Sequence, residues 1–237
     1  MKYLYSILVW SLGGILFALI LLFGILLTYL LPPKQFNPPI QWMFRFWLKL
    51  FFIRVKVEGY ENIEANKVYI YMSNHTSIFD LPVLLGYIPQ YSRGIEAHHH
   101  FTWPLWGWAI KRYGNIPINR GSVQNSIQTL RFAADILRNG TSITILPEGH
   151  LTPDGEIQEF KKLPFLLAKE SHVAIAPIGL SGLYNVKRKG NWLIQPAKVT
   201  VRFGEIINSE KIELLDIKGI SSLLRDRIIS LNKIEVS

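Results

Sequence analysis

A histidine and an aspartate with four residues between them follow the apolar run Val-Tyr-Ile-Tyr-Met. They are His75 and Asp80, in the segment Ser-Asn-His-Thr-Ser-Ile-Phe-Asp. A carboxylate at this spacing can hold one imidazole nitrogen, which fixes the tautomer and orientation of the ring, while the other nitrogen takes a proton from a hydroxyl group. The spacing alone is weak support for this chemistry, because an unconnected histidine and a helix-capping aspartate give the same pattern.

Two further polar groups follow short apolar runs. Glu148 comes two residues after Ser-Ile-Thr-Ile-Leu, and Arg120 ends Gly-Asn-Ile-Pro-Ile-Asn-Arg. In α/β proteins ligands bind beyond the carboxyl ends of strands, so we expect His75, Asp80 and Glu148 to converge there. The planar guanidinium of Arg120 suits a phosphate group. Taken singly, Glu148 could equally be an ordinary loop acid and Arg120 a solvated surface residue.

These residues belong to four short blocks whose order is informative. The blocks are Asn-His-x4-Asp at 74–80, Gly-Asn-Ile-Pro-Ile-Asn-Arg at 114–120, Leu-Pro-Glu-Gly at 146–149 and Val-Ala-Ile-Ala-Pro at 173–177. In this order they resemble the glycerolipid acyltransferase family, and the resemblance covers about residues 54–207. It implies transfer of a fatty acyl group from a thioester to the free hydroxyl of a lysophospholipid, foremost lysophosphatidic acid, which gives phosphatidic acid.

The resemblance also implies a mechanism. His75 would act as the general base on the acceptor hydroxyl, and Asp80 would orient it. The resulting oxygen attacks the thioester directly, which agrees with the absence of cysteine and of a Gly-x-Ser-x-Gly motif. The donor would be acyl-CoA or acyl-acyl-carrier protein, and we expect neither a metal ion nor a cofactor.

Five further residues receive substrate-binding roles from the resemblance. Arg120 would hold the phosphate of the acceptor, and Glu148 with Gly149 would shape the glycerol end of the site. Asn74 and Pro177 would complete it.

Two departures from the family pattern concern the cations near the acceptor phosphate. The family's Glu-Gly-Thr-Arg is Glu-Gly-His-Leu here, so Leu151 stands where an arginine is usual. A lysine-bearing Ala-Lys-x-Glu-Leu segment is replaced by Glu-Ala-His-His-His at 96–100. A phosphodiester lysophospholipid, a lyso-aminolipid and a non-catalytic lipid-binding role therefore stay open as alternatives. The three adjacent histidines also raise metal binding, but neighbouring side chains diverge rather than chelate.

The N-terminal segment has the composition of a membrane anchor. From Leu4 to Leu31 there are 28 consecutive residues without a charge, whereas a helix needs about 20 to cross a bilayer core. Gly13-Gly14 is a weak point, and Pro32-Pro33 ends the helix. The apolar run exceeds the 7–15 residues of a signal-peptide core and no Ala-x-Ala-like site follows it, which disfavours a cleaved leader.

The next segment, residues 41–53, has a narrow polar stripe. Gln41, Arg45 and Lys49 recur every four residues among Trp, Phe and Leu. This pattern predicts a helix in the membrane interface, with cations on phosphates and aromatic rings at headgroup depth. A buried amphipathic helix of the globular core is the alternative.

The charge of the chain is concentrated beside this apolar segment. The 26 Lys and Arg against 17 Asp and Glu give +9, and residues 1–57 contribute +6 of it without one acidic residue. Positive residues after the span place the rest of the chain on the cytoplasmic side of the inner membrane. The remaining +3, with one basic cluster at 187–189, argues against nucleic acid as a partner.

Apolar β-rich runs alternate with helical patterns from residue 54 onward. This alternation predicts an α/β fold, a single mixed β-sheet domain covered by helices at 54–237, preceded by membrane-anchoring helices at 1–53. We expect strands at 54–57, 68–72, 116–118, 142–146, 173–180, 192–194 and 198–203. We expect helices at 78–85, 104–113, 122–139, 163–171 and 220–231, with Ser122 as an N-cap.

Overall fold

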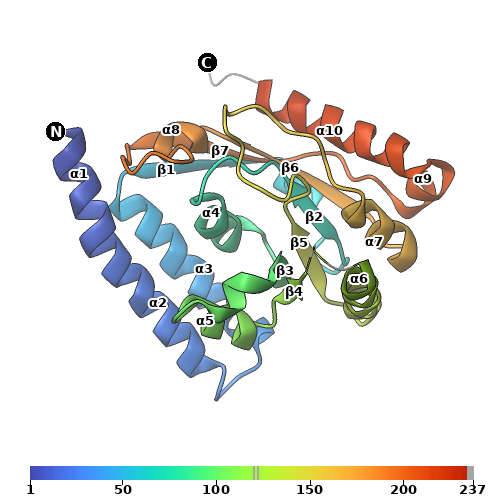
Figure 1. Ribbon diagram of the computed structural model, residues 1–237, viewed down its shortest axis with the longest axis horizontal. Helices are drawn as coiled ribbons and strands as arrows, with labels where there is room; N and C mark the ends of the chain where they lie inside the picture. Colours follow the sequence, from blue (N-terminus) through green and yellow to red (C-terminus); the bar gives the residue numbers. More distant parts are fainter. Residues whose placement is uncertain (120, 122, 234–237) are drawn as a thin grey trace.

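The computed structural model describes residues 1–119, 121 and 123–233, and in this part of the chain one mixed sheet forms the centre of the molecule (Figure 1). The strand order is β1-β7-β6-β2-β5-β3-β4. Neighbouring strands pair in parallel, except β6 and β7, which are antiparallel. The strands are β1 Ile53–Glu58, β2 Ile70–Ser73, β3 Ser92–Ala97, β4 Ile116–Ile118, β5 Ser142–Ile145, β6 Ile175–Ser181 and β7 Ala197–Phe203.

Helices cover both faces of the sheet, which confirms the predicted α/β class. Helices α2, α3 and α4 lie over one face, and α6, α7 and α10 over the other (Figure 1). The α-helices are α1 Lys2–Leu8, α2 Gly14–Leu27, α3 Pro33–Leu50, α4 Asp80–Tyr87, α5 Trp106–Tyr113, α6 Val123–Arg138, α7 Leu163–Ser171, α8 Leu183–Val186, α9 Ser209–Leu214 and α10 Ile217–Lys233.

The central strand β2 shows why the sheet is buried on both sides. Tyr71 belongs to the apolar cluster under α3 and α4, whereas Ile70 and Met72 belong to the cluster under α6, α7 and α10. Successive side chains of a strand point to opposite faces, so a run that is apolar at every position fits a parallel strand covered twice. The carboxyl end of this strand therefore opens directly into the loop that carries His75.

The N-terminal helices form a long apolar rod. A helix over Lys2–Leu27 has a mean hydropathy of 2.5 in its most apolar window and the length of a membrane span. It contains a π-helical turn, Val9–Gly13, at the expected weak point. Trp47 of α3 donates from its indole nitrogen to the carbonyl oxygen of Gly13 at 2.9 Å. The rod therefore packs on α3 through specific contacts.

Helix α3 uses its two faces differently. Gln41 is buried and its amide donates to the carbonyl oxygen of Ile88. Arg45 donates to the carbonyl oxygen of Gly86 at 2.5 Å and lies over the ring of Tyr87. Two of the three stripe residues thus bind the end of α4, and the exposed face of α3 carries aromatic rings instead.

Two predictions about individual elements were wrong. Residues 192–194, expected as a strand, form a loop whose backbone bonds to α1, where the hydroxyl of Ser6 accepts from the N–H of Ile194 at 2.9 Å. Strand β3 was not expected, because its Ser-Arg-Gly-Ile-Glu-Ala sequence has only one β-branched residue, Ile95, and no aromatic residue. The proposed N-cap Ser122 lies outside the described residues.

Candidate active site

His75 lies in the loop after β2 and is paired with Asp80. The Nδ1 atom of His75 is 2.8 Å from Oδ2 of Asp80. Because an ionised carboxylate only accepts hydrogen bonds, Nδ1 is the donor in this pair, which leaves Nε2 as the ring nitrogen that can take up a proton. Asp80 is 0% exposed, while the His75 side chain keeps 18% exposure. The arrangement is that of a general base held by a buried carboxylate.

The loop that joins the two residues also holds the carboxylate of Asp80. Its Oδ2 accepts from the backbone N–H of Thr76 at 2.7 Å and of Ser77 at 3.0 Å. Asp80 is also the first residue of α4, where the helix dipole favours negative charge. These hydrogen bonds fix the position of the Asp80 carboxylate.

Glu148 fixes the backbone of His75. Its Oε1 accepts from the N–H of His75 at 2.6 Å, and its Oε2 accepts from the N–H of Gln158 at 2.9 Å. Burial raises the pKa of this carboxyl, and the two backbone N–H groups act in the opposite direction. The carbonyl oxygen of His75 accepts from the N–H of Thr152 at 2.9 Å. Both backbone groups of His75 are therefore bound by the 148–158 loop.

The other predicted site residues have different surroundings. The amide of Asn74 bonds to both backbone groups of Leu180 at 2.8 Å, which ties the His75 loop to β6. Gly149 has a φ of 75°, a left-handed conformation that favours glycine, directly after Glu148. Pro177 is buried inside β6. Arg120 lies outside the described residues.

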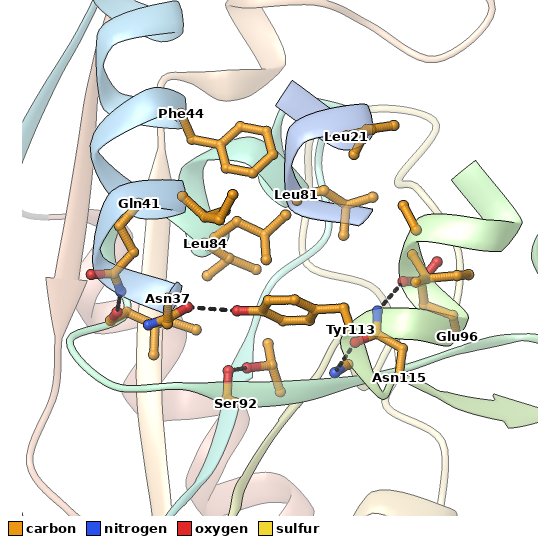
Figure 2. Close-up of a pocket in the computed structure, with 18 of the residues that line it drawn as sticks. Leu21, Asn37, Gln41, Phe44, Leu81, Leu84, Ser92, Glu96, Tyr113 and Asn115 are labelled. Carbon is orange, nitrogen blue, oxygen red and sulfur yellow. Dashed lines mark hydrogen bonds between the residues drawn. The ribbon is translucent and has the colours of Figure 1, made fainter. Parts of the chain in front are cut away.

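An apolar cavity of about 120 Å³ adjoins these loops (Figure 2). It lies between the sheet and helices α2 to α5, and its walls include Leu81, which follows Asp80, and Leu146, which precedes the Glu148 loop. Ser92 marks its other end, because it pairs with the first residue of β5 at the amino ends of the strands. The cavity therefore extends along the sheet from Leu81 and Leu146, the neighbours of the two loops, and its lining does not include His75, Asp80 or Glu148 themselves.

The wall of this cavity has a polar group that the motifs did not indicate. Glu96 accepts from the amide of Asn115 at 2.7 Å and from the indole of Trp106 at 3.2 Å, and it lies 3.2 Å from Nδ1 of His100. Asn37 and Tyr113 form a second polar pair in the wall, at 2.5 Å (Figure 2). Among the described residues no group of three His, Cys, Asp or Glu is placed to hold a metal ion.

The fold and the site define a class: an α/β protein that holds a histidine–aspartate base at the carboxyl ends of its strands, beside an apolar cavity. The chain belongs to the Acyltransferase family, whose model matches residues 54–181. The resemblance expected from the four blocks is therefore confirmed.

Curated relatives have names within one area of lipid chemistry. A chloroplastic 1-acyl-sn-glycerol-3-phosphate acyltransferase from Arabidopsis thaliana is 29% identical over 69% of this chain and 46% of its own length. A protein of the same activity name from Borreliella burgdorferi is 27% identical over 75% of this chain and 71% of its own. A lyso-ornithine lipid O-acyltransferase from Pseudomonas aeruginosa is 30% identical over 64% and 58%. The chain spans about half the length of the plant relatives it matches.

A solved structure has the same fold over the whole chain. It is the 1-acyl-sn-glycerophosphate (LPA) acyltransferase PlsC from Thermotoga maritima, with a TM-score of 0.84. The two chains are 23% identical, and the match covers 100% of this chain and 98% of the other. The apolar N-terminal helices are therefore part of the shared fold.

Proposed function

We propose that this protein is a membrane-bound acyltransferase that moves a fatty acyl group from an acyl thioester to the free hydroxyl of lysophosphatidic acid, forming phosphatidic acid. The observation that carries the proposal is the His75–Asp80 pair, fixed by backbone bonds beside an apolar cavity.

The proposed reaction follows from the state of His75. Its Nε2 takes the proton of the acceptor hydroxyl while the oxygen attacks the thioester carbon. The tetrahedral intermediate then collapses to the ester and a thiolate, which receives the proton from His75. The carboxylate of Asp80 stabilises the imidazolium that forms between these steps. A base positioned in this way contributes about 10²–10⁴ to the rate.

We place the acyl chain of the donor in the apolar cavity. Its lining is mainly apolar, and one end adjoins the loops that carry His75 and Glu148. The thioester would lie at this end, and coenzyme A or acyl carrier protein would remain outside the cavity. No metal ion or cofactor takes part in the proposed reaction.

The N-terminal helices suit the proposed location in the cytoplasmic membrane. The rod of α1 and α2 has the hydropathy of a span and is largely unburied. Residues 1–53 would hold the protein on the bilayer, with the domain at 54–237 on the cytoplasmic face, where the lipid acceptor can reach His75 from the membrane.

A second acceptor has support from two observations. One relative acts on lyso-ornithine lipid by name, and this chain carries Leu151 where the family motif has an arginine. A panel of lysophosphatidic acid, a phosphodiester lysophospholipid and lyso-ornithine lipid, each with acyl-CoA and acyl-carrier-protein donors, separates these acceptors. Turnover confined to lyso-ornithine lipid would overturn the phosphatidate assignment.

The mechanism is tested by His75→Asn, which keeps an amide donor for Asp80 but cannot take up a proton. We expect acyl transfer to fall by about 10²–10⁴-fold with the melting temperature unchanged. His172→Asn is a matched control, because His172 also pairs with a carboxylate, Glu213, but on the exposed surface between α7 and α9. Undiminished turnover in His75→Asn contradicts the mechanism. If the wild-type protein transfers no acyl group to any acceptor, this result favours a non-catalytic lipid-binding module.

A further inference from the structure

Three consecutive cations lie against the two loops of the proposed site. They are Lys187, Arg188 and Lys189, in the loop after α8. The hydroxyl of Ser77, in the loop that carries His75, donates to the carbonyl oxygen of Lys187 at 2.9 Å. The ammonium group of Lys189 donates to the carbonyl oxygen of Leu151 at 3.2 Å. The basic loop therefore contacts the His75 loop on one side and the Glu148 loop on the other.

The contact with Leu151 places a cation next to a motif position that lacks its usual arginine. Leu151 occupies the position at which the family motif has an arginine. Lys189, 38 residues further along the chain, brings an ammonium nitrogen to the backbone of this same residue. The motif thus lacks a cation in sequence, but another loop of the fold brings one close to the same position.

These cations have no carboxylate partner among the described residues. Lys187 is partly buried, and burial lowers the pKa of its ammonium group. Arg188 lies 5.0 Å above the ring of Tyr184. Asp154, in the adjoining loop, is engaged by Thr152 and by other groups of its own loop. A cluster of positive charge without a carboxylate partner at this place favours an anionic ligand.

The ammonium groups of Lys187 and Lys189 donate to the carbonyl oxygens of Arg188 and Leu151, and further contacts that do not involve charge also hold the loop in position. Tyr184 donates to the carbonyl oxygen of Pro153 at 3.3 Å, and the N–H of Gln195 donates to that of Val186 at 2.9 Å. The N–H of Asn191 donates to the carbonyl oxygen of Arg188 at 3.2 Å. The backbone thus presents the cations at a fixed place before any ligand binds.

We infer that Lys189, flanked by Lys187 and Arg188, binds a phosphate group of a substrate at the edge of the active site, in place of the missing arginine. The inference rests on the proposed function. The phosphate has two sources, the headgroup of the lipid acceptor and the nucleotide of coenzyme A. Both carry negative charge that ammonium and guanidinium groups bind.

The test uses the full-length protein in detergent micelles with lysophosphatidic acid and acyl-CoA. Lys189→Gln is expected to raise the KM for the phosphate-bearing substrate by about 10- to 100-fold, the loss of one charge-assisted hydrogen bond, with kcat little changed. Lys189→Arg is expected to restore the wild-type KM. Lys211→Gln, on an exposed lysine of α9 far from α8 (Figure 1), is the matched control and leaves both KM values unchanged.

The two sources of phosphate give different results. A rise in KM for lysophosphatidic acid alone assigns the site to the acceptor. A rise for acyl-CoA alone, absent with an acyl-pantetheine donor that lacks the phosphates, assigns it to the donor. Unchanged KM values for both substrates overturn the inference, including the case in which Lys189→Gln lowers only the binding to anionic vesicles.

Failure of the proposed function can be recognised separately. Calorimetric binding of lysophosphatidic acid and of coenzyme A to His75→Asn, with and without Lys189→Gln, requires no turnover. If the wild-type protein transfers no acyl group, these measurements still decide the inference: weaker binding of either ligand in the double variant supports it, and equal binding of both ligands contradicts it.

Discussion

At the scale of single residues, three contacts to His75 set the position of its ring nitrogens, one of which is the base in the proposed reaction. Asp80 holds the ring, Glu148 holds the N–H, and Thr152 holds the carbonyl oxygen. A side chain whose backbone is bound on both sides loses little further freedom when substrate arrives, which is the preorganisation that proximity effects require. We therefore interpret Glu148 as a positioning residue and not as a substrate contact.

Glu148→Gln tests this interpretation. In this variant the NH₂ group of the glutamine replaces one of the two accepting oxygens, and it would face the N–H of either His75 or Gln158 as a second donor. We therefore expect kcat to fall at least tenfold, with a smaller change in KM. The melting temperature should change little, because the lost hydrogen bond is offset by removal of the buried charge whose desolvation raises the pKa of this carboxyl. Glu159→Gln, on an exposed side chain nearby, is the control.

Glu148→Ala separates positioning from support of the fold. It leaves two backbone N–H groups unsatisfied, at a cost of about 1–3 kcal/mol each. We therefore expect a lower free energy of unfolding for this variant. An equal loss of melting temperature in the glutamine and alanine variants, with kcat retained in the former, would assign Glu148 to the fold alone.

At the scale of elements, the sequence was sufficient to predict strands and helices whose local residue pattern agrees with their burial in the fold. Strands β4 and β5 and helix α7 were expected at or within one residue of their observed bounds. Strand β3 was missed because its place is set by pairing with β5 and β4, a long-range property that Ser92 and Gly94 do not reveal. Residues 192–194 have strand-like side chains, but they bind the N-terminal helix instead.

In the candidate site, too, part of the arrangement was predictable from the sequence and part depends on tertiary contacts. The order of the motifs and the rule that ligands bind at the carboxyl ends of strands were sufficient to bring His75, Asp80 and Glu148 together. The part played by Glu148 was not predictable, because it depends on a backbone contact between loops 73 residues apart. The approach of Lys189 to Leu151 likewise follows from tertiary structure alone.

Helix α2 contributes to the proposed acyl site through Gly24, which lines the cavity. A Cβ added there would lie 3.4 Å from Cδ1 of Ile40, an ordinary contact, so Gly24→Leu should fold and fill space at the cavity wall. We expect the preference among acyl-CoA donors to shift to shorter chains, with about a fourfold loss for each methylene that no longer fits.

The control for this variant lies in the same helix. Gly14 has no neighbour within 4 Å of an added Cβ and is exposed, so Gly14→Leu adds the same side chain outside the cavity. Competition assays with acyl-CoA donors of graded length compare the two variants. The same shift in both, or in neither, would contradict the placement of the acyl chain in this cavity.

At the scale of the whole molecule, the excess positive charge and the exposed apolar surface both lie at the N-terminal helices. Residues 1–57 carry six basic and no acidic residues. Large apolar side chains are exposed along α1 and α2, and Trp42 and Phe46 stack on the exposed face of α3. The opposite face of α3 is buried against the domain. The N-terminal helices thus form one wall of the core and also present an apolar surface with cations beside it.

This arrangement makes deletion of the N-terminal helices a poor test of membrane attachment. Removal of residues 1–53 would delete core residues such as Phe44 and Leu48 and uncover the apolar cluster to which they belong, so loss of membrane binding could reflect unfolding. Single substitutions on the exposed face avoid this difficulty. Phe46 on α3 and Phe132 on α6 are 53% and 54% exposed, and therefore form a matched pair.

We expect Phe46→Ser to weaken co-sedimentation with anionic phospholipid vesicles by about tenfold, because a phenylalanine ring contributes about 1.5–3 kcal/mol when it is fully transferred from water and less at the interface. Phe132→Ser, on the other side of the sheet (Figure 1), should bind as the wild type does, and both variants should retain the wild-type melting temperature. Equal binding by the two variants would mean that the exposed face of α3 does not enter the bilayer, and that α1 and α2 alone hold the protein on the membrane.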